Sequence, residues 1–507
     1  CEYAHAMENS VGNLNEYTTA FERYDHLCGG YIWDFVDQSI RQKTPEGDRW
    51  LYGDDFKERF RLSGHKNIFS VGSNRYFCAN GIVAADRTPH PSAYEVKKCY
   101  QTLHVLPMNL HESRFLVRNN QLFSDLSAYD LTWRTEVEGV LWEAGKVPPT
   151  LYQNVAPLCG REFQIAFQKT IPPGKEAFIT FRFLLKESAP WAEKGYELAF
   201  SQIPLQKRKL SAYHSTAPTP RLTWESERLT VMGEGFSYTF AQGMLISARI
   251  REKEWLRSPL RPNHFRAQTD NDRGFSNFVP QLLPFLPCEK WKRAAKRETA
   301  RPMEARIEDG YVRVTAQWKH PLLKRSEVVY KVYGDGSVEI CQFSHSKKLE
   351  LPRAGMRLCL PESFQSARWY GRGPHENYPD RETGAPVSRY VLTVKELEHR
   401  YMRPQENGTR GGVRELTLAG SMGTFAVEDL SGNGLLFSAH AYAQEALDAA
   451  EHLHELKYED FVELSLDGAM CGVGGDLPGV AALHEPYILK PSETYGLHAR
   501  VRFLPKE

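Results

Sequence analysis

Two residues that could do chemistry lie at the very start of the chain, where Glu2 precedes His5. A later apolar and aromatic run, residues 29–39, places Trp33 directly before an acidic side chain. A carboxylate, polar donors and a flat aromatic face are what a pocket that cleaves sugars requires. Glu2 is therefore a candidate nucleophile. Taken alone, the same residue types also fit a salt-bridged or capping glutamate, a structural histidine and a core tryptophan.

The elements that must position these residues have an α/β pattern over residues 1–103. We predict a strand at 31–35, a long polar loop at 42–74 and a second helix at about 92–103. Functional side chains of a parallel (β/α) barrel lie at the C-terminal strand ends. The block therefore looks like the last two units of such a barrel. A first helix is predicted by apolar residues at helical spacing: Leu14, Tyr17, Phe21 and Tyr24.

Strand-like alternation replaces this pattern from about residue 104, for example at 131–137. Residues 104–212 are typical of a small immunoglobulin-like β-sandwich. Residues 213–221 are typical of a linker. Residues 222–507 predict a large two-sheet β-sandwich, in which two β-prone runs flank a Gly-Asp-Gly turn. The predicted fold class is multidomain, with part of a (β/α)8 barrel followed by two β-sandwiches.

Composition narrows the choice of partners. A chain of 507 residues is long enough for about three domains. Lys and Arg (64) balance Asp and Glu (63), which gives no reason to expect nucleic acid or an acidic membrane surface as a partner. No apolar run approaches the ~18 residues that span a bilayer. Nine dispersed cysteines favour reduced thiols and a cytoplasmic location.

A family resemblance is carried by Cys-Glu-Tyr-Ala-His-Ala-Met at residues 1–7, followed by Asn9 and Ser10. This stretch is similar to the nucleophile strand of the large bacterial β-galactosidases of glycoside hydrolase family 2. The resemblance implies that Glu2 attacks the anomeric carbon and forms a covalent galactosyl-enzyme. It also implies that His5 contacts the sugar hydroxyls and that Trp33 forms an apolar face of the galactose pocket.

Two further features of the N-terminal block bear on this site. Glu8 occupies a position where many relatives have Gly, which bears on backbone shape or on subsite charge. The segment around Phe77 and Asn80 resembles the place where the family binds Na⁺ or K⁺, through a backbone carbonyl of the Phe and the side-chain oxygen of the Asn. Asn80 is also an expected substrate contact. Asp34 and Asp37 either organise the barrel mouth or pair with cationic side chains such as Arg87.

Three motifs of the C-terminal block also resemble the family. Residues 269–274 and 470–476 are similar to loops that approach the active site, with Asp272, Gly274, Gly475 and Asp476 as candidate site residues. Gly479 follows where enterobacterial relatives have a Trp that stacks on the glucose of lactose, so we expect a different preferred aglycone. Residues 371–381 and 404–410 resemble signatures of the large sandwich domain, whose fold is galactose-mutarotase-like in this family. We expect most polar groups of these Gly/Pro turns to satisfy buried backbone.

The resemblance extends over residues 1–507 and implies the C-terminal half of a retaining β-galactosidase. The acid/base Glu and the Mg²⁺ ligands are expected upstream, in a missing N-terminal half that is the expected partner. We therefore expect the isolated chain to be inactive and the complete enzyme to be a homo-oligomer that takes β-galactosides. We also expect residues 1–103 to be poorly ordered by themselves. Two alternatives stay open: another family 2 specificity, such as that of a β-glucuronidase, and a non-catalytic carbohydrate-binding or complementing subunit.

Overall fold

The computed structural model describes residues 2–45, 47–53, 55, 78–277, 280–477 and 483–506. It divides into two compact units. One unit consists of Cys1–Ala93, Tyr213–Ala385 and Tyr390–Glu507. The other consists of Tyr94–Ala212 and Pro386–Arg389. The division of the sequence into 1–103, 104–212, 213–221 and 222–507 stays a prediction.

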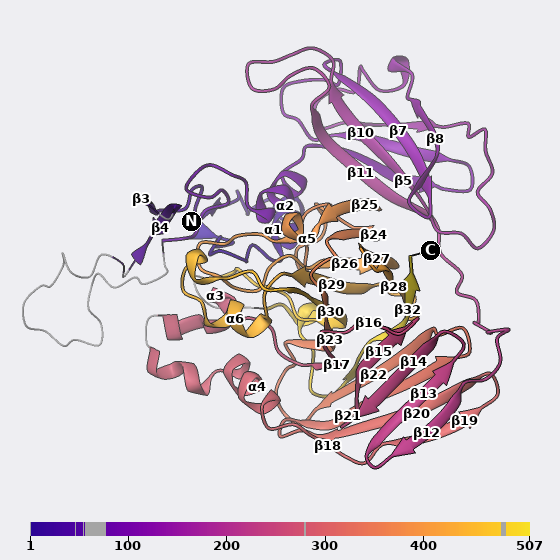
Figure 1. Ribbon diagram of the computed structural model, residues 1–507. Coiled ribbons are helices and arrows are strands. Elements are labelled where there is room, and N and C mark those ends of the chain that lie inside the picture. The colour runs from indigo at the N-terminus through magenta and orange to yellow at the C-terminus, as the bar shows by residue number, and fades with distance from the viewer. Residues whose placement is uncertain are drawn as a thin grey trace, which may run out of the picture. The chain divides into compact units, whose positions relative to one another are not determined.

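The N-terminal segment, which begins at the chain end marked N in Figure 1, is built around two short parallel strands, β1 (Glu2–Tyr3) and β2 (Tyr31–Ile32). Glu2 pairs with Tyr31 and Tyr3 with Ile32. Between the strands lies α1 (Leu14–Arg23), which confirms the first predicted helix. Tyr17 and Phe21 of this helix pack edge-on against the ring of Tyr3, with centroid distances of 5.0 and 5.5 Å. The predicted helix face therefore anchors the helix to the strand that carries Glu2.

Other N-terminal elements differ from the sequence prediction. The second strand ends at Ile32 because the backbone hydrogen bonds after it turn toward residues 80–83. The predicted loop at 42–74 contains an antiparallel hairpin of β3 (Ile40–Thr44) and β4 (Gly47–Leu51). Gly47 makes the tight turn possible because its φ of +123° is open to glycine. The second helix, α2, spans Pro91–Cys99.

The unit of residues 94–212 is a two-sheet β-sandwich with its own core. A four-stranded sheet has the order β11-β10-β7-β8 and a three-stranded sheet the order β5-β6-β9. Inward-facing apolar side chains of both sheets form one cluster, in which Phe115, Phe163 and Phe181 contact one another. The alternation predicted at 131–137 is confirmed by the burial pattern of β7. The bounds are β5 (Leu103–Asn109), β6 (Arg114–Asn119), β7 (Tyr129–Val137), β8 (Val140–Lys146), η2 (Pro149–Leu151), β9 (Gly160–Gln164), β10 (Ala177–Leu185) and β11 (Glu197–Gln206).

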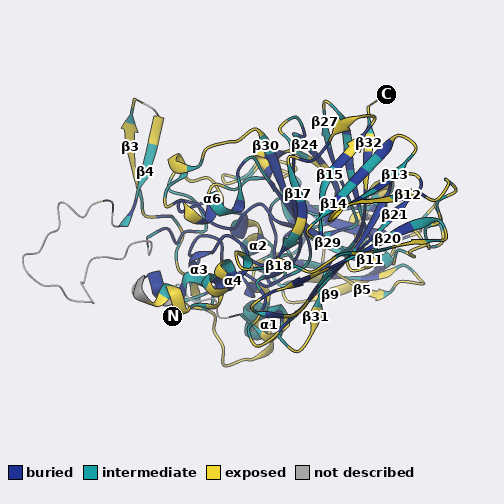
Figure 2. Ribbon diagram, turned by 60° about the horizontal axis from the view of Figure 1, so that its bottom comes forward, coloured by how far each residue is buried: buried dark blue, intermediate teal, exposed yellow. Residues whose placement is uncertain are grey.

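The large β-sandwich packs two broad sheets around one apolar core. The first sheet contains β12 (Arg221–Glu225), β13 (Arg228–Gly233), β14 (Phe236–Ala241), β15 (Met244–Ile250), β16 (Lys253–Glu254), β17 (Ser258–Asn263), β23 (Arg353–Pro361), β30 (Phe461–Met470), β29 (Leu435–His440) and β26 (Arg410–Val413). Figure 2 shows that β29 and β30 are buried over most of their length.

The second sheet contains β18 (Thr299–Ala300), β19 (Glu304–Glu308), β20 (Tyr311–Lys319), β21 (Leu323–Tyr333), β22 (Val338–Ser346), β31 (Thr494–Tyr495), β32 (His498–Pro505), β28 (Gly423–Asp429), β27 (Glu415–Gly420), β24 (Ser366–Arg372) and β25 (Val387–Thr393). The predicted hairpin is confirmed by β21 and β22. At its turn the Asp335 carboxylate accepts a hydrogen bond from the Ser337 amide at 3.0 Å.

Short helices lie in the connections between the strands of the large sandwich, and some fall within loops that the sequence predicts. They are α3 (Asp270–Arg273), η3 (Gly274–Asn277), η4 (Pro280–Phe285), α4 (Pro287–Ala295), α5 (Val394–Leu397), α6 (Gln444–Ala449), η5 (Leu453–Glu455) and η6 (Glu485–Tyr487). Among the described residues, none of the helices has the length and apolar character needed to cross a bilayer. Every cysteine in the described part of the chain is a free thiol.

Candidate active site

Three backbone segments meet where β1 and β2 end. The Ala6 amide donates to the Trp33 carbonyl at 2.6 Å, and the Asp34 amide donates to the Asn80 carbonyl at 2.6 Å. The peptide bond between Trp33 and Asp34 is cis. These bonds bring together the strand of Glu2 and His5, the tryptophan and the asparagine that the sequence predicts at one site. The side chain of Glu2 lies outside the described part of the structure, so only the position of the Glu2 backbone is described here.

His5 and Trp33 differ in their access to solvent. His5 is buried at 1% exposure, whereas Trp33 is 45% exposed. Burial lowers the pKa of His5 to about 4, against a smaller opposing effect of the Asp34 charge. The imidazole is therefore neutral at neutral pH, and one ring nitrogen is a donor while the other is an acceptor. The exposed indole of Trp33 is free to offer an apolar surface to a ligand.

A polar network connects the segment that follows β2 with the segment at residue 80. Gln38 Nε2 donates to Asp34 Oδ2 at 2.7 Å and lies 3.3 Å from Asn80 Oδ1. Asn80 is buried, so its side chain is fixed by this network. Phe77, the other ligand of the predicted Na⁺ or K⁺ site, lies outside the described residues. Asn80 Oδ1 is an oxygen ligand of the type that Na⁺ or K⁺ requires. A cation bound to this oxygen would share it with Gln38 Nε2, which lies 3.3 Å away.

Asp37 organises the strand ends, as one of the two sequence interpretations holds. Its Oδ1 accepts the Gly81 amide at 2.7 Å, and its Oδ2 lies 2.8 Å from His90 Nε2. His90 Nδ1 in turn lies 2.7 Å from His399 Nε2. Burial holds the pKa of His399 well below its usual value. The Arg87 side chain donates instead to the Ala85 carbonyl.

His90 and His399 were not predicted as part of this region. His90 lies between two prolines, and His399 follows 309 residues later. A contact over that separation is set by tertiary packing and leaves no local pattern in the sequence.

Glu8 has a structural role that explains its departure from Gly. Its backbone has a φ of +56°, in the left-handed region that glycine adopts most readily. Its buried carboxyl accepts the backbone amides of Met402 at 3.2 Å and Arg403 at 3.0 Å. Burial, with the nearby charges of Asp37 and Asp270, raises the pKa of Glu8 well above its usual value. Glu8 therefore ties the N-terminal segment to a loop of the large sandwich.

The predicted loop at 470–476 lies directly against the N-terminal segment. The His5 amide donates to the Gly475 carbonyl at 2.6 Å, and the Gly12 amide donates to the Gly474 carbonyl at 2.7 Å. The Asp380 carboxylate accepts the Gly474 amide at 2.8 Å and the Val473 amide at 2.9 Å. Gly475 therefore contacts the backbone of His5, and its role as an active-site loop residue stays a prediction.

Asp476 and Asp272, two other predicted site residues, are engaged with protein groups. Asp476 Oδ1 accepts from the Tyr17 hydroxyl at 2.6 Å, and its Oδ2 lies 2.7 Å from His484 Nε2. Asp272 forms a two-pronged ion pair with Arg266 at 2.9 and 3.0 Å. Gly274, with a φ of +47°, terminates α3. Their predicted role as active-site loop residues stays a prediction.

The Gly/Pro turns at residues 371–381 and 404–410 satisfy buried backbone, as expected. Arg381 Nη1 donates to the Ser10 carbonyl at 2.5 Å, and its Nη2 pairs with Glu376 Oε1 at 2.7 Å. Glu376 Oε2 also accepts the Gly408 amide at 2.6 Å. Arg410 Nη1 donates to the Gly408 carbonyl at 2.7 Å. These side chains hold the loops that contact the N-terminal segment.

Comparison with known proteins identifies the family. The family described as Beta galactosidase small chain matches residues 232–501, which is more than half of the chain. The chain belongs to the family 2 β-galactosidases. Residues 1–105 match the TIM barrel domain of family 2 glycosyl hydrolases, and residues 115–206 match domain 4 of β-galactosidase. The β1–β2 pair is thus part of a TIM barrel, followed by an immunoglobulin-like sandwich and a large β-sandwich.

Curated relatives in this family are bacterial proteins named β-galactosidase. The one from Priestia megaterium is 33% identical over 98% of this chain and 46% of its own length. Those from Halalkalibacterium halodurans and Vibrio cholerae are 31% and 32% identical over 97% and 99% of this chain, and 47% and 48% of theirs. The chain spans about half the length of the curated relatives it matches. A solved aldose 1-epimerase described as putative, from Escherichia coli K12, has a TM-score of 0.31 at 10% identity over 54% of this chain and 97% of its own.

Proposed function

We propose that this chain carries the nucleophile of a retaining β-galactosidase that hydrolyses terminal non-reducing β-D-galactosides. The observation that carries the proposal is the strand pairing of Glu2 with Tyr31, continued by the hydrogen bond from Ala6 to Trp33. This pairing puts Glu2, His5 and Trp33 at the ends of adjacent parallel strands in a family 2 barrel domain. Functional side chains occupy that end of the barrel in this fold.

The reaction follows as a double displacement. A carboxylate oxygen of Glu2 bonds to the anomeric carbon while the glycosidic C–O bond breaks, and the leaving oxygen takes a proton from an acid/base Glu. Water then attacks the anomeric carbon, gives its proton to that same Glu and releases galactose with the Glu2 carboxylate restored. The acid/base Glu is supplied by the N-terminal half that the relatives possess, so this chain alone is inactive.

The neighbouring side chains support the two steps. The neutral imidazole of His5 can both donate to and accept from sugar hydroxyls. The exposed face of Trp33 covers the apolar side of the galactose ring. Asn80, with the Phe77 carbonyl, is the proposed ligand of a Na⁺ or K⁺ ion, and the Mg²⁺ ligands of the complete enzyme lie in the other half. Titration of the complete enzyme with Na⁺ or K⁺ against a choline salt tests the monovalent site.

The decisive experiment uses the chain joined to an N-terminal half of the kind that the curated relatives possess. Cleavage of nitrophenyl β-galactoside should fall by roughly 10³-fold or more in Glu2→Gly, as expected when a covalent nucleophile is lost. Added azide should restore turnover and give the galactosyl azide of inverted configuration. Full activity of Glu2→Gly, or hydrolysis with inversion by the parent enzyme, would contradict the proposal.

Two alternatives are separated by the same material. Faster cleavage of nitrophenyl β-glucuronide than of the galactoside would indicate another family 2 specificity. A complementing subunit is the second candidate, because the matching family is described as a small chain. It predicts that this chain, mixed with a separately expressed N-terminal half, forms an active complex. Sugar binding that Trp33→Ala abolishes, without activity in that mixture, would instead support a non-catalytic subunit.

A further inference from the structure

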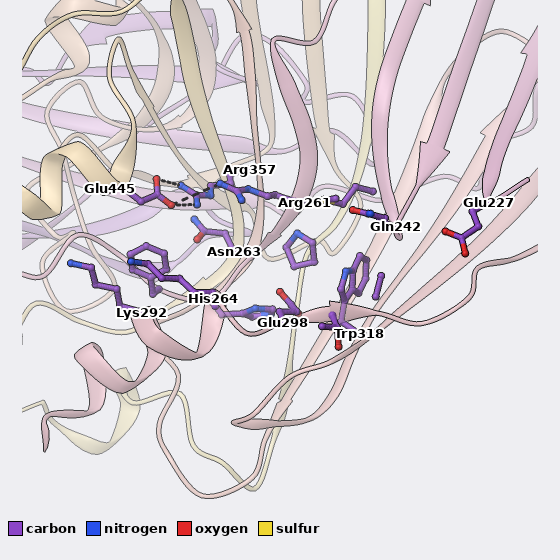
Figure 3. A pocket seen from close by; sticks show the side chains of 17 residues that line it. Glu227, Gln242, Arg261, Asn263, His264, Lys292, Glu298, Trp318, Arg357 and Glu445 are labelled. Atoms are coloured by element: carbon purple, nitrogen blue, oxygen red, sulfur yellow. Dashed lines mark hydrogen bonds and ion pairs between the residues drawn. The ribbon is translucent and has the colours of Figure 1, made fainter. Parts of the chain in front are cut away.

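The large β-sandwich contains a cavity of about 580 Å³, shown in Figure 3. This volume falls within the ~300–1,000 Å³ of pockets that enclose small organic ligands. The lining residues lie between Glu227 and Glu445 in sequence. They come from β15, β17, α4, β20, β23 and α6, so the cavity is built from the sandwich sheets and the helices between their strands.

Part of the cavity wall is made of polar groups that are already paired within the protein. Arg357 Nη1 donates to Glu445 Oε2 at 2.9 Å, as the dashed lines in Figure 3 indicate. Such pairs fix the orientation of the side chains, so this part of the wall is preorganised. Further pairs are Arg357 with Glu463 at 3.4 Å, Asn263 Nδ2 with Gln444 Oε1 at 3.1 Å, His264 Nε2 with Ser344 Oγ at 2.8 Å, and Lys292 with Asp448.

Other polar groups of the wall keep hydrogen-bonding capacity. The Arg261 guanidinium is 45% exposed, and its ion-pair partner Glu445 lies 3.8 Å away, beyond hydrogen-bond distance. Glu298 accepts one hydrogen bond, from Ser326 Oγ at 3.0 Å. Burial raises the pKa of Glu298 to about 7, so near neutral pH its carboxyl exists in both accepting and donating forms. A ligand with several hydroxyl groups could use both residues.

Charge and shape narrow the class of ligand. Once Arg357 is paired with Glu445 and Lys292 with Asp448, the cations Arg261 and Lys296 face the carboxylate of Glu227 and the partly ionised carboxyl of Glu298, so no large excess of either charge remains. A neutral ligand fits this balance better than an ion. Trp318, which is 8% exposed, adds aromatic surface to the same cavity. Carbohydrates are the neutral ligands that combine many hydroxyls with an apolar ring face.

We propose that this cavity is a binding site for a neutral mono- or disaccharide, held by Arg261 and Glu298 against Trp318. The inference goes beyond the proposed function, because none of the residues that carry it takes part in the galactosidase chemistry. It also needs only residues of this chain. Saccharide binding should therefore be measurable with the chain as it stands.

The test is calorimetric titration of the full chain with galactose, glucose, lactose and galacturonate. We expect at least one neutral sugar to bind. Glu298→Gln and Arg261→Met should each weaken that binding by about tenfold, the loss expected for one hydrogen bond to a charged group. Both are partly exposed positions, so the fold should persist, which the thermal melting curve checks.

Two matched controls separate this cavity from the candidate active site. Arg257→Met changes an exposed arginine of the same sandwich whose ion-pair partner is Asp460, and it should leave binding unchanged. Trp33→Ala changes the proposed galactose pocket and should also leave binding unchanged. The proposal is overturned if no neutral sugar binds, if galacturonate binds more tightly than galactose, if the two cavity variants bind normally, or if Trp33→Ala abolishes binding. Failure here leaves the Glu2 experiment unaffected.

Discussion

The sandwich of residues 94–212 and the N-terminal segment of residues 2–93 satisfy their buried polar groups differently. In the small sandwich, Asn119 Nδ2 donates to the Ser124 and Val155 carbonyls, five and 36 residues away. In the N-terminal segment, Asn9 Nδ2 donates to the Glu406 carbonyl, 397 residues away. The Asn119 bonds stay within residues 94–212, although the buried Glu136 of this sandwich also accepts from Ser388, 252 residues away. The Asn9 bond instead reaches a loop of the large sandwich.

The apolar cores differ in the same way. Phe115, Phe163 and Phe181 belong to a cluster made wholly by the small sandwich. The N-terminal cluster of Met7, Tyr52 and Ala79 is completed by Met402 of the large sandwich. We infer that the small sandwich is autonomous, whereas the N-terminal segment is held in place by loops that lie hundreds of residues downstream. The expectation that residues 1–103 are poorly ordered by themselves stays a prediction, and this dependence supports it.

The largest expected effect is a destabilisation of the small sandwich that leaves the N-terminal segment unchanged. Phe181→Ala removes a fully buried ring from the small sandwich and should cost about 4 kcal/mol of its unfolding free energy. Because its contacts are internal to that sandwich, the N-terminal segment should keep its resistance to limited proteolysis. Urea unfolding followed by proteolysis of both regions measures this. Simultaneous loss of protection in both regions would mean that they are one cooperative unit.

The next largest effect is a destabilisation of the N-terminal segment that leaves the small sandwich unchanged. Arg381→Met removes the donor to the Ser10 carbonyl and leaves Glu376 buried without its cation. Breaking a buried pair costs ~3–5 kcal/mol. We expect about 3 kcal/mol, because Glu376 keeps Tyr401 and Gly408 as donors. Residues 2–45 should become protease-sensitive while the small sandwich is unchanged.

A control for this variant is Arg293→Met, which removes an ion pair with Glu289 one helical turn away. That arginine is 52% exposed, so the loss should stay within ~0.5 kcal/mol. Equal destabilisation by the two arginine variants would show that the buried connection to Ser10 has no special weight.

Gly12→Ala should have an intermediate effect. A Cβ at this position would lie 2.1 Å from Asp380 Oδ2, and that carboxylate is fixed by the Val473 and Gly474 amides. Overpacking of this kind costs ~1–3 kcal/mol. The urea concentration at which half of the large unit is unfolded should fall accordingly. Gly310→Ala is the control for backbone strain. Its φ is +82° and an added Cβ would meet nothing within 4 Å, so this variant carries strain without a steric clash. A smaller cost for Gly12→Ala than for Gly310→Ala would contradict the close approach.

The smallest effect depends on pH. Burial lowers the pKa of His484, but its bonds to Glu16 and Asp476 outweigh burial, and the pKa is raised above 6.5. Because the folded value is the higher one, the stabilisation is complete below about pH 6.5 and is lost as pH rises through the raised pKa. The stability difference between the parent and His484→Gln should shrink from pH 6 to pH 9. A difference that grows with pH would reverse the assigned sign, and the exposed His111→Gln serves as control.

Local patterns predicted what local interactions determine. The face of Tyr17 and Phe21 predicted α1, and the Gly-Asp-Gly turn predicted the hairpin of β21 and β22. The run containing Glu2 and His5 predicted the family. By contrast, the contact of His90 with His399 joins residues 309 positions apart, and no local pattern carries it. The hairpin at residues 40–51 was also missed, because its first strand is mostly polar and exposed and its second is only partly buried, so neither has the apolar alternation that predicts strands.

The central claim is that Glu2 forms the covalent galactosyl-enzyme. Its most direct test is to treat the complete enzyme with a 2-deoxy-2-fluoro-galactosyl fluoride, which slows hydrolysis of such an intermediate, and to locate the label by peptide mass spectrometry. We predict one fluorogalactosyl group on the peptide containing Glu2, released on reactivation with loss of the label. A label on another carboxylate, such as Asp34, or turnover without any covalent adduct, would contradict the account.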